Sequence, residues 1–581
     1  MEKRFTTILG LVLMLCIQTS AQSFETAEDA VKNMGIGWNL GNTLEANAQT
    51  VTDVNNDAYW GQQGVESETC WGQPKTTREF IKMLKAAGFT AIRVPVTWYN
   101  HLNKENEIDN AWMARVKEVV DYVIDEGLYC IINVHHDTGA DSRDANGNLT
   151  GYHWLKADPD NYTLSAARLI GLWEQIAMTF KDYDQKLLFE GFNEILDGNS
   201  CWNYPTWSAN GAYDEEYAKK AYQAVNDYNQ AFVTTVRLTG GNNATRNLIV
   251  NTYAASSGGI WGNNTHPQEP LTEMTLPNDD TSGHLIFEVH RYPNIQNGLA
   301  NAKKDVDATI ESLNTILKPK GAPVIFGEWG TSNVDNGSDY IDRRQSMIEF
   351  CEYFVKQCKA NDIATFYWMG LSDGSNRTIP AFNQADLVER IMKAYYGEDY
   401  NGQWPNADDF EMNYIVNYTQ QWAEVNLFVG NANLTSYKGL RIEMAEDNHN
   451  GSLQLKVYGD ADNKEQFLNL TENSNTTTIT FNSSKLGSKV TRVTLQYKLT
   501  ENSYNATITK AVLIKNDNTE ETLKASAFWG CTVVSLSLGS NGIYTPIIKH
   551  ADGNIYNLNG QRISKPSKGI YIQNGRKYLV R

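Results

Sequence analysis

Short apolar runs separated by polar, periodic segments dominate the first two thirds of the chain. Runs that are apolar at nearly every position are typical of strands buried on both faces, as in a parallel sheet covered by helices. Eight such runs occur, at residues 36–40, 91–95, 130–134, 187–192, 248–251, 285–289, 324–327 and 365–369.

The segments between the runs have the periodicity of amphipathic helices. One helix is expected to begin after Thr77 and to end at Gly88, and the next to end at Gly127. Eight strand–helix units predict an α/β fold, a closed (β/α)8 barrel, for residues 24–400. The alternative, a doubly wound open sheet, would gather polar residues at one switch point, whereas here they follow nearly every run.

The pattern changes after about residue 400. Residues 401–409 are rich in Asn, Gly, Asp and Pro and are expected to form a linker. Residues 410–540 alternate apolar and polar positions between turn residues, which predicts an antiparallel β-sandwich. The end of the chain, residues 541–581, contains DGNIY and KGIY and is expected to form short strands with tight turns. It resembles the C-terminal attachment or sorting tails of secreted proteins from some Gram-negative bacteria.

The N-terminus has the features of a signal peptide. Two basic residues precede an apolar run at 8–17, and small residues at 19–21 form a cleavage site. A run of roughly ten residues is too short to span a bilayer. We therefore expect removal of residues 1–21 and export to the periplasm, the medium or the outer cell surface. Lipidation of Cys16 is the alternative, but its neighbours do not suit that processing.

Composition narrows the class of partner. The formal net charge of −18 would repel a polyanion, so no nucleic-acid partner is expected. The chain holds 15 Trp and 30 Tyr, which either fill cores or form platforms for the apolar faces of sugars. Its seven cysteines include no CxxC pair, which argues against a dense disulfide framework.

Two glutamates directly after apolar runs carry the strongest chemical signal. Asn193 and Glu194 follow the fourth run, and Glu328 follows the seventh. Residues at the carboxyl ends of barrel strands face the active site, so both carboxyls would line one cleft. Such a pair cleaves glycosidic bonds: one protonates the leaving oxygen and the other stabilises or captures the cationic carbon. Metal ligation is the competing interpretation. Glu190 lies inside the fourth run, before its end.

Polar residues at other strand ends support this site. Arg93 is placed to keep a catalytic carboxylate ionised, unless it forms a surface ion pair. Strand alternation turns His290 and Tyr292 toward the site. Trp368 is expected to form the floor beneath a sugar ring, the alternative being a place in the barrel core.

The cluster His135-His136-Asp137 suggests metal ligands when taken alone. Adjacent residues on a strand face opposite sides, so both histidines would hardly bind one ion. The chain has only nine histidines in all. We therefore expect no metal and no cofactor.

Residues 35–400 resemble glycoside hydrolase family five, the large cellulase family. The matching residues occur in family order: Arg93, His135, Asn193, Glu194, His290, Tyr292, Glu328 and Trp368. The phrases GWNLGNTLE at 37–45 and IRVPVTW at 92–98 are similar to an endoglucanase branch that includes xyloglucan-active enzymes. Trp38, Asn39 and His136 complete the expected set of substrate-binding or supporting residues.

The resemblance implies roles for these residues. Glu194 would be the acid/base and Glu328 the nucleophile, with net retention of configuration. Arg93 and Tyr292 would hold Glu328, His290 would lie near Glu194, and Asn193 would bind the sugar 2-hydroxyl. Two departures concern substrate preference: the branch more often has an aromatic residue at position 291 and Pro at position 195.

We therefore expect a monomeric, exported endo-β-1,4-glucanase that hydrolyses cellulose-like, mixed-linkage or xyloglucan chains by double displacement. Its rivals are an endo-β-1,4-mannanase and a catalytically silent polysaccharide-binding protein. Residues 410–540 are either a carbohydrate-binding module or a spacer with buried aromatics. The candidate ring platforms of such a module are Trp422, Tyr437, Tyr497 and Trp529. The tail would attach the protein to the cell surface.

Overall fold

A computed structural model describes most of the chain. It covers residues 24–47, residues 64–537 and four short strands between residues 555 and 580. Short gaps within 64–537 fall at 144, 147–148, 152, 159, 161, 207–212, 261–264, 332–338, 408–411, 446–450, 461–463, 472 and 501–503. The expected signal peptide lies outside the described residues.

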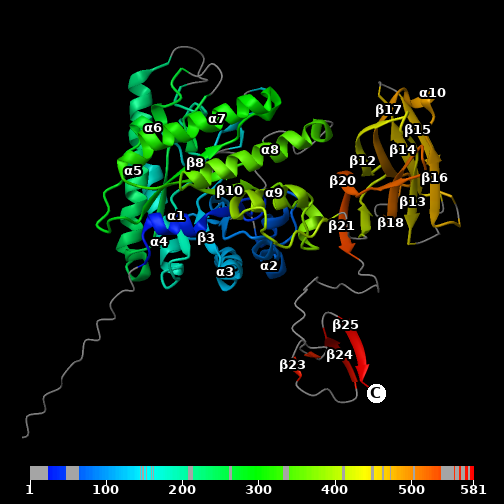
Figure 1. The fold of residues 1–581 in the computed structure, drawn as a ribbon, viewed down its shortest axis with the longest axis horizontal. Coiled ribbons are helices and arrows are strands. Elements are labelled where there is room, and N and C mark those ends of the chain that lie inside the picture. The colour runs from blue at the N-terminus through cyan, green and yellow to red at the C-terminus, as the bar shows by residue number, and fades with distance from the viewer. Residues whose placement is uncertain are drawn as a thin grey trace, which may run out of the picture.

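Eight parallel strands close into a barrel in the order β1-β10-β9-β8-β7-β6-β3-β2. Figure 1 shows the helices that cover the outside of this barrel. They are β1 (Ile36–Asn39), β2 (Ala91–Val94), β3 (Tyr129–Asn133), β6 (Leu187–Glu190), β7 (Leu248–Asn251), β8 (Leu285–Arg291), β9 (Val324–Trp329) and β10 (Ala364–Trp368). Each strand coincides with a predicted apolar run, so the predicted barrel is confirmed.

Helices surround the barrel. They are α1 (Ala27–Met34), α2 (Arg78–Ala87), α3 (Asn110–Asp125), α4 (Tyr162–Thr179), α5 (Glu215–Leu238), α6 (Glu269–Glu273), α7 (Leu299–Ser312), α8 (Asp339–Ala360) and α9 (Ala385–Tyr396). The two ends of α2 show how local sequence sets the bounds of a helix. Thr77 Oγ1 accepts a hydrogen bond from the first turn, and Gly88 takes the left-handed φ of +118° that glycine tolerates. A short ribbon, β4 (Ser142–Arg143) and β5 (Leu149–Gly151), lies in the loop after β3.

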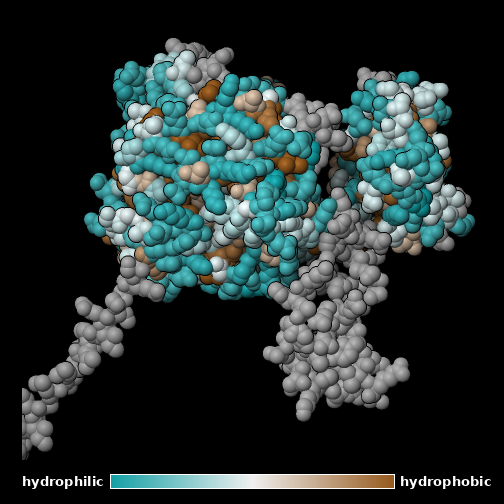
Figure 2. Space-filling model, viewed as in Figure 1, coloured by the Kyte–Doolittle hydropathy of each residue, from teal (hydrophilic) through white to brown (hydrophobic). Residues whose placement is uncertain are grey.

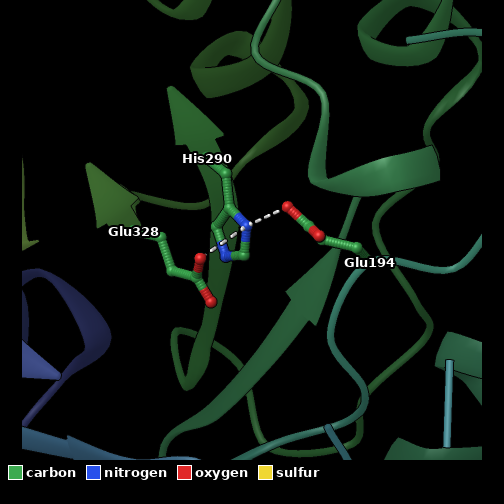
Figure 3. Close-up of side chains that lie close together, drawn as sticks. All are labelled: Glu194, His290 and Glu328. Carbon is green, nitrogen blue, oxygen red and sulfur yellow. Dashed lines mark hydrogen bonds and ion pairs between the residues drawn. The ribbon is translucent and has the colours of Figure 1, made fainter. Parts of the chain in front are cut away.

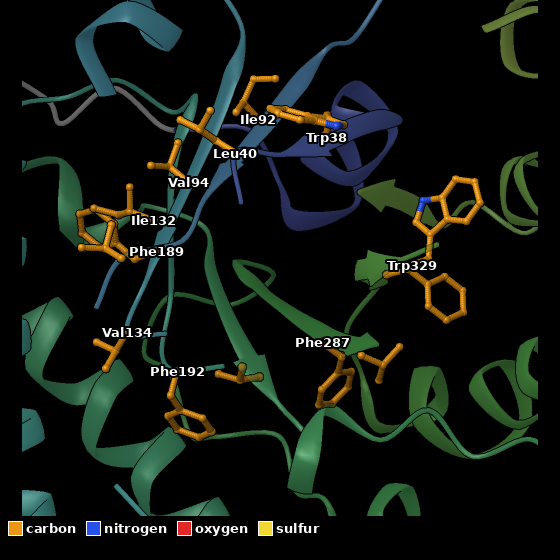
Figure 4. Close-up of a cluster of buried hydrophobic side chains, with 14 of the residues drawn as sticks. Trp38, Leu40, Ile92, Val94, Ile132, Val134, Phe189, Phe192, Phe287 and Trp329 are labelled. Atoms are coloured by element: carbon orange, nitrogen blue, oxygen red, sulfur yellow. The ribbon is translucent and has the colours of Figure 1, made fainter. Parts of the chain in front are cut away.

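Strand alternation divides the barrel residues into an outer and an inner set. The outer set packs against the helices in one apolar cluster, with Trp38, Val94, Phe189 and Trp329 among its members (Figure 4). Trp38 therefore does not face the site: it is fully buried beside Phe80, with ring centroids 5.6 Å apart. Its expected part in substrate binding is wrong, because its parity on β1 directs it outward.

The inner set changes from apolar to polar along the barrel axis. The apolar layer includes Ala91, Ile131, Leu188, Ile249, Ile286, Ile325 and Phe366. A layer of fully buried polar residues follows. Five of them lie two residues after an apolar inner residue of the same strand, and Asn39 ends β1: the set is Asn39, Arg93, Asn133, Glu190, Asn251 and Glu288. This polar layer lies directly beneath the carboxyl ends of the strands and supports whatever is placed there.

Residues 412–537 form two antiparallel sheets over a separate apolar core, so the predicted β-sandwich is confirmed. One sheet has the order β16-β13-β18-β11-β21, with β19 beside β18, and the other has the order β15-β14-β17-β12-β20. The strands are β11 (Met412–Tyr418), β12 (Glu424–Asn433), β13 (Tyr437–Met444), β14 (Leu453–Tyr458), β15 (Glu465–Asn469), β16 (Thr476–Thr480), β17 (Lys489–Tyr497), β18 (Tyr504–Lys515), β19 (Glu520–Thr522), β20 (Ser526–Trp529) and β21 (Cys531–Ser537), with helix α10 (Ser483–Leu486) between β16 and β17.

The four expected ring platforms of the sandwich have different environments. Tyr497 is fully buried in the core because it shares the inward face of its strand, so this expectation is wrong. Tyr437 is half-buried and donates to Glu521. Trp422 and Trp529 are 47% and 49% exposed.

The segment expected to be a linker lies against the barrel. Trp404 Nε1 donates to Ala87 O over 3.0 Å, and the backbone of Phe382 bonds to both Pro405 and Ala407. Ile379 and Ala381, from the loop after β10, belong to the apolar cluster of the sandwich. The sandwich is thus anchored to the loop that follows the eighth barrel strand.

The tail forms a four-stranded sheet in the order β23-β22-β24-β25. Its strands are β22 (Ile555–Tyr556), β23 (Arg562–Ile563), β24 (Gly569–Gln573) and β25 (Arg576–Val580). The view in Figure 2 shows a mainly hydrophilic surface over the barrel helices, with apolar side chains scattered. Among the described helices, none has the length and apolarity needed to cross a bilayer. The six cysteines of the described residues form no disulfide with one another.

Candidate active site

Two carboxylates and an imidazole meet at the carboxyl ends of three strands (Figure 3). Glu194 follows β6, Glu328 lies near the end of β9, and His290 lies on β8. One carboxylate oxygen of each glutamate and one ring nitrogen of His290 all lie within 4.8 Å of one another. So close an approach suits the roughly 5–5.5 Å between the carboxyl groups of retaining glycosidases better than the roughly 6.5–9.5 Å of inverting ones. The Glu194 side chain is 23% exposed, so a ligand in the site can reach it.

Glu328 is held on both sides. Arg93 Nη1 lies 2.8 Å from its Oε1, and Tyr292 donates its hydroxyl to Oε2 over 2.7 Å. Burial raises the pKa of Glu328, while His290 and Arg93 oppose that rise. Burial also raises the pKa of Tyr292 well above its usual value, which keeps the phenol a donor. These contacts fix the orientation of the Glu328 carboxylate.

Arg93 connects this carboxylate to the polar layer. Its guanidinium donates to both oxygens of Glu190 over 2.7 Å, to Asn39 Oδ1 over 2.9 Å and to Asn193 Oδ1 over 2.8 Å. Burial lowers the pKa of Arg93, but the facing glutamates more than compensate and raise it. Glu190 is therefore a structural partner of the site and has no contact with solvent.

His290 bridges Glu194 to a carboxylate that sequence analysis did not single out. Its Nδ1 lies 2.7 Å from Glu194 Oε1, and its Nε2 lies 2.6 Å from Glu288 Oε1. Strand parity places Glu288 inward, because it stands two residues after Ile286 and two before His290 on β8. This alternation could have identified Glu288 as an inward-facing residue from the sequence, although a glutamate in a protein interior is unusual.

The His135-His136-Asp137 cluster departs from its predicted geometry. Strand β3 ends at Asn133, so alternation no longer governs the two histidines. Their ring centroids lie 4.5 Å apart, and the expectation that they face opposite sides is wrong. The Asp137 carboxylate is occupied by N–H donors from Trp98, Tyr99 and Trp154. It therefore clamps the loop after β2 instead of facing a ligand.

A row of flat rings leads to the carboxylates. Trp368 at the end of β10 lies parallel to His135, with ring centroids 5.7 Å apart, and His135 Nε2 is 3.9 Å from Glu328 Oε1. His136 continues the row to Trp71, 5.2 Å away and 39% exposed. In the loop after β6, Trp202 is 40% exposed. Neither tryptophan follows an apolar run directly, so strand-end analysis did not find them.

Two carboxylates that approach each other at the carboxyl ends of the strands of a (β/α)8 barrel, with aromatic rings beside them, are typical of a glycoside hydrolase. The model of the family described as cellulase, glycosyl hydrolase family 5, matches residues 49–373. This chain belongs to glycosyl hydrolase family 5. The match lies within the barrel and stops before the sandwich.

Named relatives agree with this assignment. Endoglucanase B of Neocallimastix patriciarum is 31% identical over 398 residues, which cover 66% of this chain and 73% of that protein. A xyloglucan-specific endo-β-1,4-glucanase of Bacteroides ovatus is 34% identical, over 62% of this chain and 68% of its own. A solved structure of a broad-specificity family 5 endoglucanase from an uncultured bacterium is 51% identical to this chain, with a TM-score of 0.59. The match covers 65% of this chain and 97% of the endoglucanase chain.

Proposed function

We propose that this protein is a retaining endo-β-1,4-glucanase in which Glu194 is the acid/base and Glu328 the nucleophile. The close approach of these two carboxylates around His290 carries the proposal. Glu328 attacks the anomeric carbon while Glu194 gives its proton to the departing glycosidic oxygen. Water then attacks the glycosyl-enzyme, Glu194 takes a proton from that water, and the bond from the sugar to Glu328 breaks.

The rings around the site support a polymeric substrate. The row from Trp368 to Trp71 extends from the carboxylates toward the surface, and Trp202 stands in the loop after β6. Flat rings bind the apolar faces of successive sugars, so a chain of several units gains more than a disaccharide. We propose β-1,4-glucans, including xyloglucan and mixed-linkage glucan, as the substrates of this site.

One panel of substrates tests the activity and its range. The intact protein and Glu328→Ala would be incubated with carboxymethylcellulose, xyloglucan, mixed-linkage glucan and mannan, and the reducing ends counted. We expect release from the glucans by the native protein only, with an early fall in viscosity that marks internal cleavage. Release confined to mannan would replace the glucanase assignment with a mannanase. Activity that survives in Glu328→Ala would remove Glu328 from the mechanism.

NMR of the first product formed tests the stereochemistry. We expect the β-anomer to appear first and the α-anomer to follow by mutarotation. An α-anomer at the earliest times would show inversion and contradict double displacement.

We also propose that the protein is exported through residues 1–21 and is attached to the cell surface through residues 541–581. The apolar run at 8–17 and the short strands of the tail support this. N-terminal sequencing of the protein from its native host should find residues 1–21 removed. Deleting residues 541–581 should move the enzyme from the cell surface to the medium, and an unchanged distribution would contradict the attachment.

A further inference from the structure

Trp422 occupies a position that neither packing nor backbone preference explains. It lies in the turn between β11 and β12, its side chain is 47% exposed, and its φ is +67°. A bulky residue with positive φ is strained, and such strain clusters at functional sites. A half-exposed indole also contributes less burial than a core residue does.

A second exposed indole belongs to the same corner of the sandwich. Trp529 ends the edge strand β20, is 49% exposed, and pairs in register with Glu424, the first residue of β12. The turn that carries Trp422 is joined to the end of β20, since Thr419 N donates to Gly530 O over 2.9 Å. Two indoles therefore flank the start of β12.

A fixed polar cluster centred on Glu424 adjoins them. Gln496 Nε2 donates to Glu424 Oε1 over 2.7 Å, and Tyr458 donates to the other oxygen over 2.8 Å. Trp422 N also donates to Tyr497 O over 2.7 Å, which ties the turn to β17. The corner is thus held rigid before any ligand arrives, which lowers the entropic cost of binding.

We propose that Trp422 and Trp529 bind a β-glucan chain of the kind that the barrel hydrolyses. The corner combines two flat rings with polar neighbours, whereas a stable protein interface needs an apolar core within about 1,200–2,000 Å². The net charge of −18 favours an uncharged polymer over an anionic one. The identity of the glucan rests on the proposed function of the barrel.

The sandwich also adjoins the catalytic barrel, because Ile379 and Ala381 of the loop after β10 pack into its core. A chain held at this corner would therefore be tethered to the domain that hydrolyses it. Linked sites raise each other's effective concentration without any new contact.

Binding is measured on the full chain without turnover. In a Glu328→Ala background, retention by xyloglucan and mixed-linkage glucan would be followed by affinity electrophoresis. Trp422→Ala and Trp529→Ala should each weaken retention about tenfold, a usual effect of truncating an aromatic anchor. The matched control is Phe467→Ala, since Phe467 is also 49% exposed but lies on β15 at the opposite edge of the same sheet.

Equal retention of all three variants would assign binding to the cleft or elsewhere and overturn the proposal. Loss of retention in Phe467→Ala as well would show a general surface effect and also overturn it. Failure of the proposed activity is separable, because an inactive barrel with tryptophan-dependent retention would leave this site standing.

A second, independent observation concerns Glu288. Its side chain is fully buried, its Oε1 faces His290, and its Oε2 accepts from Asn251 Nδ2. A Cβ at position 327 would lie 1.9 Å from Glu288 Oε1, so Gly327 provides the space for this carboxylate. The contact with His290 is an ion pair and not a linear hydrogen bond.

The charges around His290 decide its protonation. Burial lowers its pKa, but Glu288 and then Glu328 more than offset this and raise it well above 6.5. Three carboxylates face it: Glu194 after β6, Glu288 on its own strand β8, and Glu328 on β9. Arg93, which binds Glu328, and His135 are the nearby basic groups. A cationic His290 donates Nδ1–H to Glu194 Oε1.

We infer that Glu288 is a positioning residue that acts on the acid/base through His290. Glu288→Gln removes the charge that keeps His290 cationic, so the hydrogen bond that Glu194 accepts from His290 loses its positive donor. The basic limb of the kcat/KM profile, which reports the acid in the free enzyme, should move up by about one pH unit. Gly327→Ala, which crowds Glu288 without removing its charge, should move the limb in the same direction by less.

A basic limb that stays in place in a folded Glu288→Gln variant would overturn this role. If that variant does not fold, the nitrogen chemical shifts of His290 in the native protein decide the matter. We expect both ring nitrogens to be protonated at neutral pH, and a neutral imidazole would overturn the inference.

Discussion

Arg93 binds Glu328 and Glu190 through different nitrogens of one guanidinium. Nη1 lies 2.8 Å from Glu328 Oε1, while Nε and Nη2 each lie 2.7 Å from an oxygen of Glu190. Arg93 and Glu190 have no solvent exposure, so salt and water screen this network little. Glu190 therefore orients Glu328, the proposed nucleophile, through Arg93.

Glu190→Gln should destabilise the fold and slow catalysis together. Breaking one partner of a buried ion pair costs about 3–5 kcal/mol, because the remaining charge is left uncompensated. Urea denaturation would give the loss of stability, and kcat on a soluble glucan would give the loss of turnover. The control is Glu216→Gln, whose ion pair with Lys220 on α5 is exposed, and it should leave both unchanged. An unchanged urea midpoint in Glu190→Gln would show that the network adds no stability.

The two catalytic glutamates should differ in their response to the leaving group. Glu194→Ala should keep activity on aryl glycosides with very acidic leaving groups, since their departure needs little protonation. Glu328→Ala should be inactive on every substrate and should be partly rescued by azide, giving a product of inverted configuration. Steady-state rates across a series of aryl cellobiosides separate the two. Leaving-group sensitivity in the Glu328 variant would reverse the assignment.

Buried His135 should make the fold sensitive to acid. Burial lowers its pKa well below 6.5, so it is neutral when folded. Below pH 6.5 the unfolded chain binds a proton that the folded chain does not, and stability must fall as the pH falls. One such proton contributes at most about 1.4 kcal/mol per pH unit. Urea titrations between pH 7 and 4.5 should therefore show a shallower slope for His135→Gln. Parallel curves would contradict the assignment of this slope to His135.

The barrel and its strand-end residues were predictable because one physical pattern determines both. An apolar run buried on two faces marks the strand, and the residue after it must face the site, as Glu194 and Glu328 do. Trp38 was misplaced because matching a motif does not reveal on which side of β1 a residue points.

The histidine pair was misplaced for a different reason: the strand-alternation rule was applied beyond the end of β3. Glu288 escaped notice because a buried glutamate becomes visible only when its partners from other strands are known. Trp71 and Trp202 lie in long loops, where no periodic pattern indicates what a ring will face.

Chelators should leave activity unchanged, although the cluster His135-His136-Asp137 suggests metal ligands when the sequence is taken alone. Both Asp137 oxygens already accept hydrogen bonds from N–H donors of Trp98, Tyr99 and Trp154, so this carboxylate is engaged in holding the surrounding loops. His135 Nδ1 lies 3.0 Å from Asn133 Nδ2, and its Nε2 faces Glu328.

The chemistry gives the same answer. In the proposed mechanism Glu194 supplies the proton that activates the leaving oxygen, and positive charge develops at the sugar carbon beside Glu328. A divalent cation at that place would raise the energy of the transition state. Activity after dialysis against EDTA should therefore equal that of the untreated enzyme, with or without added calcium. A loss on dialysis that zinc or manganese restores would contradict this prediction and assign the cluster to a metal.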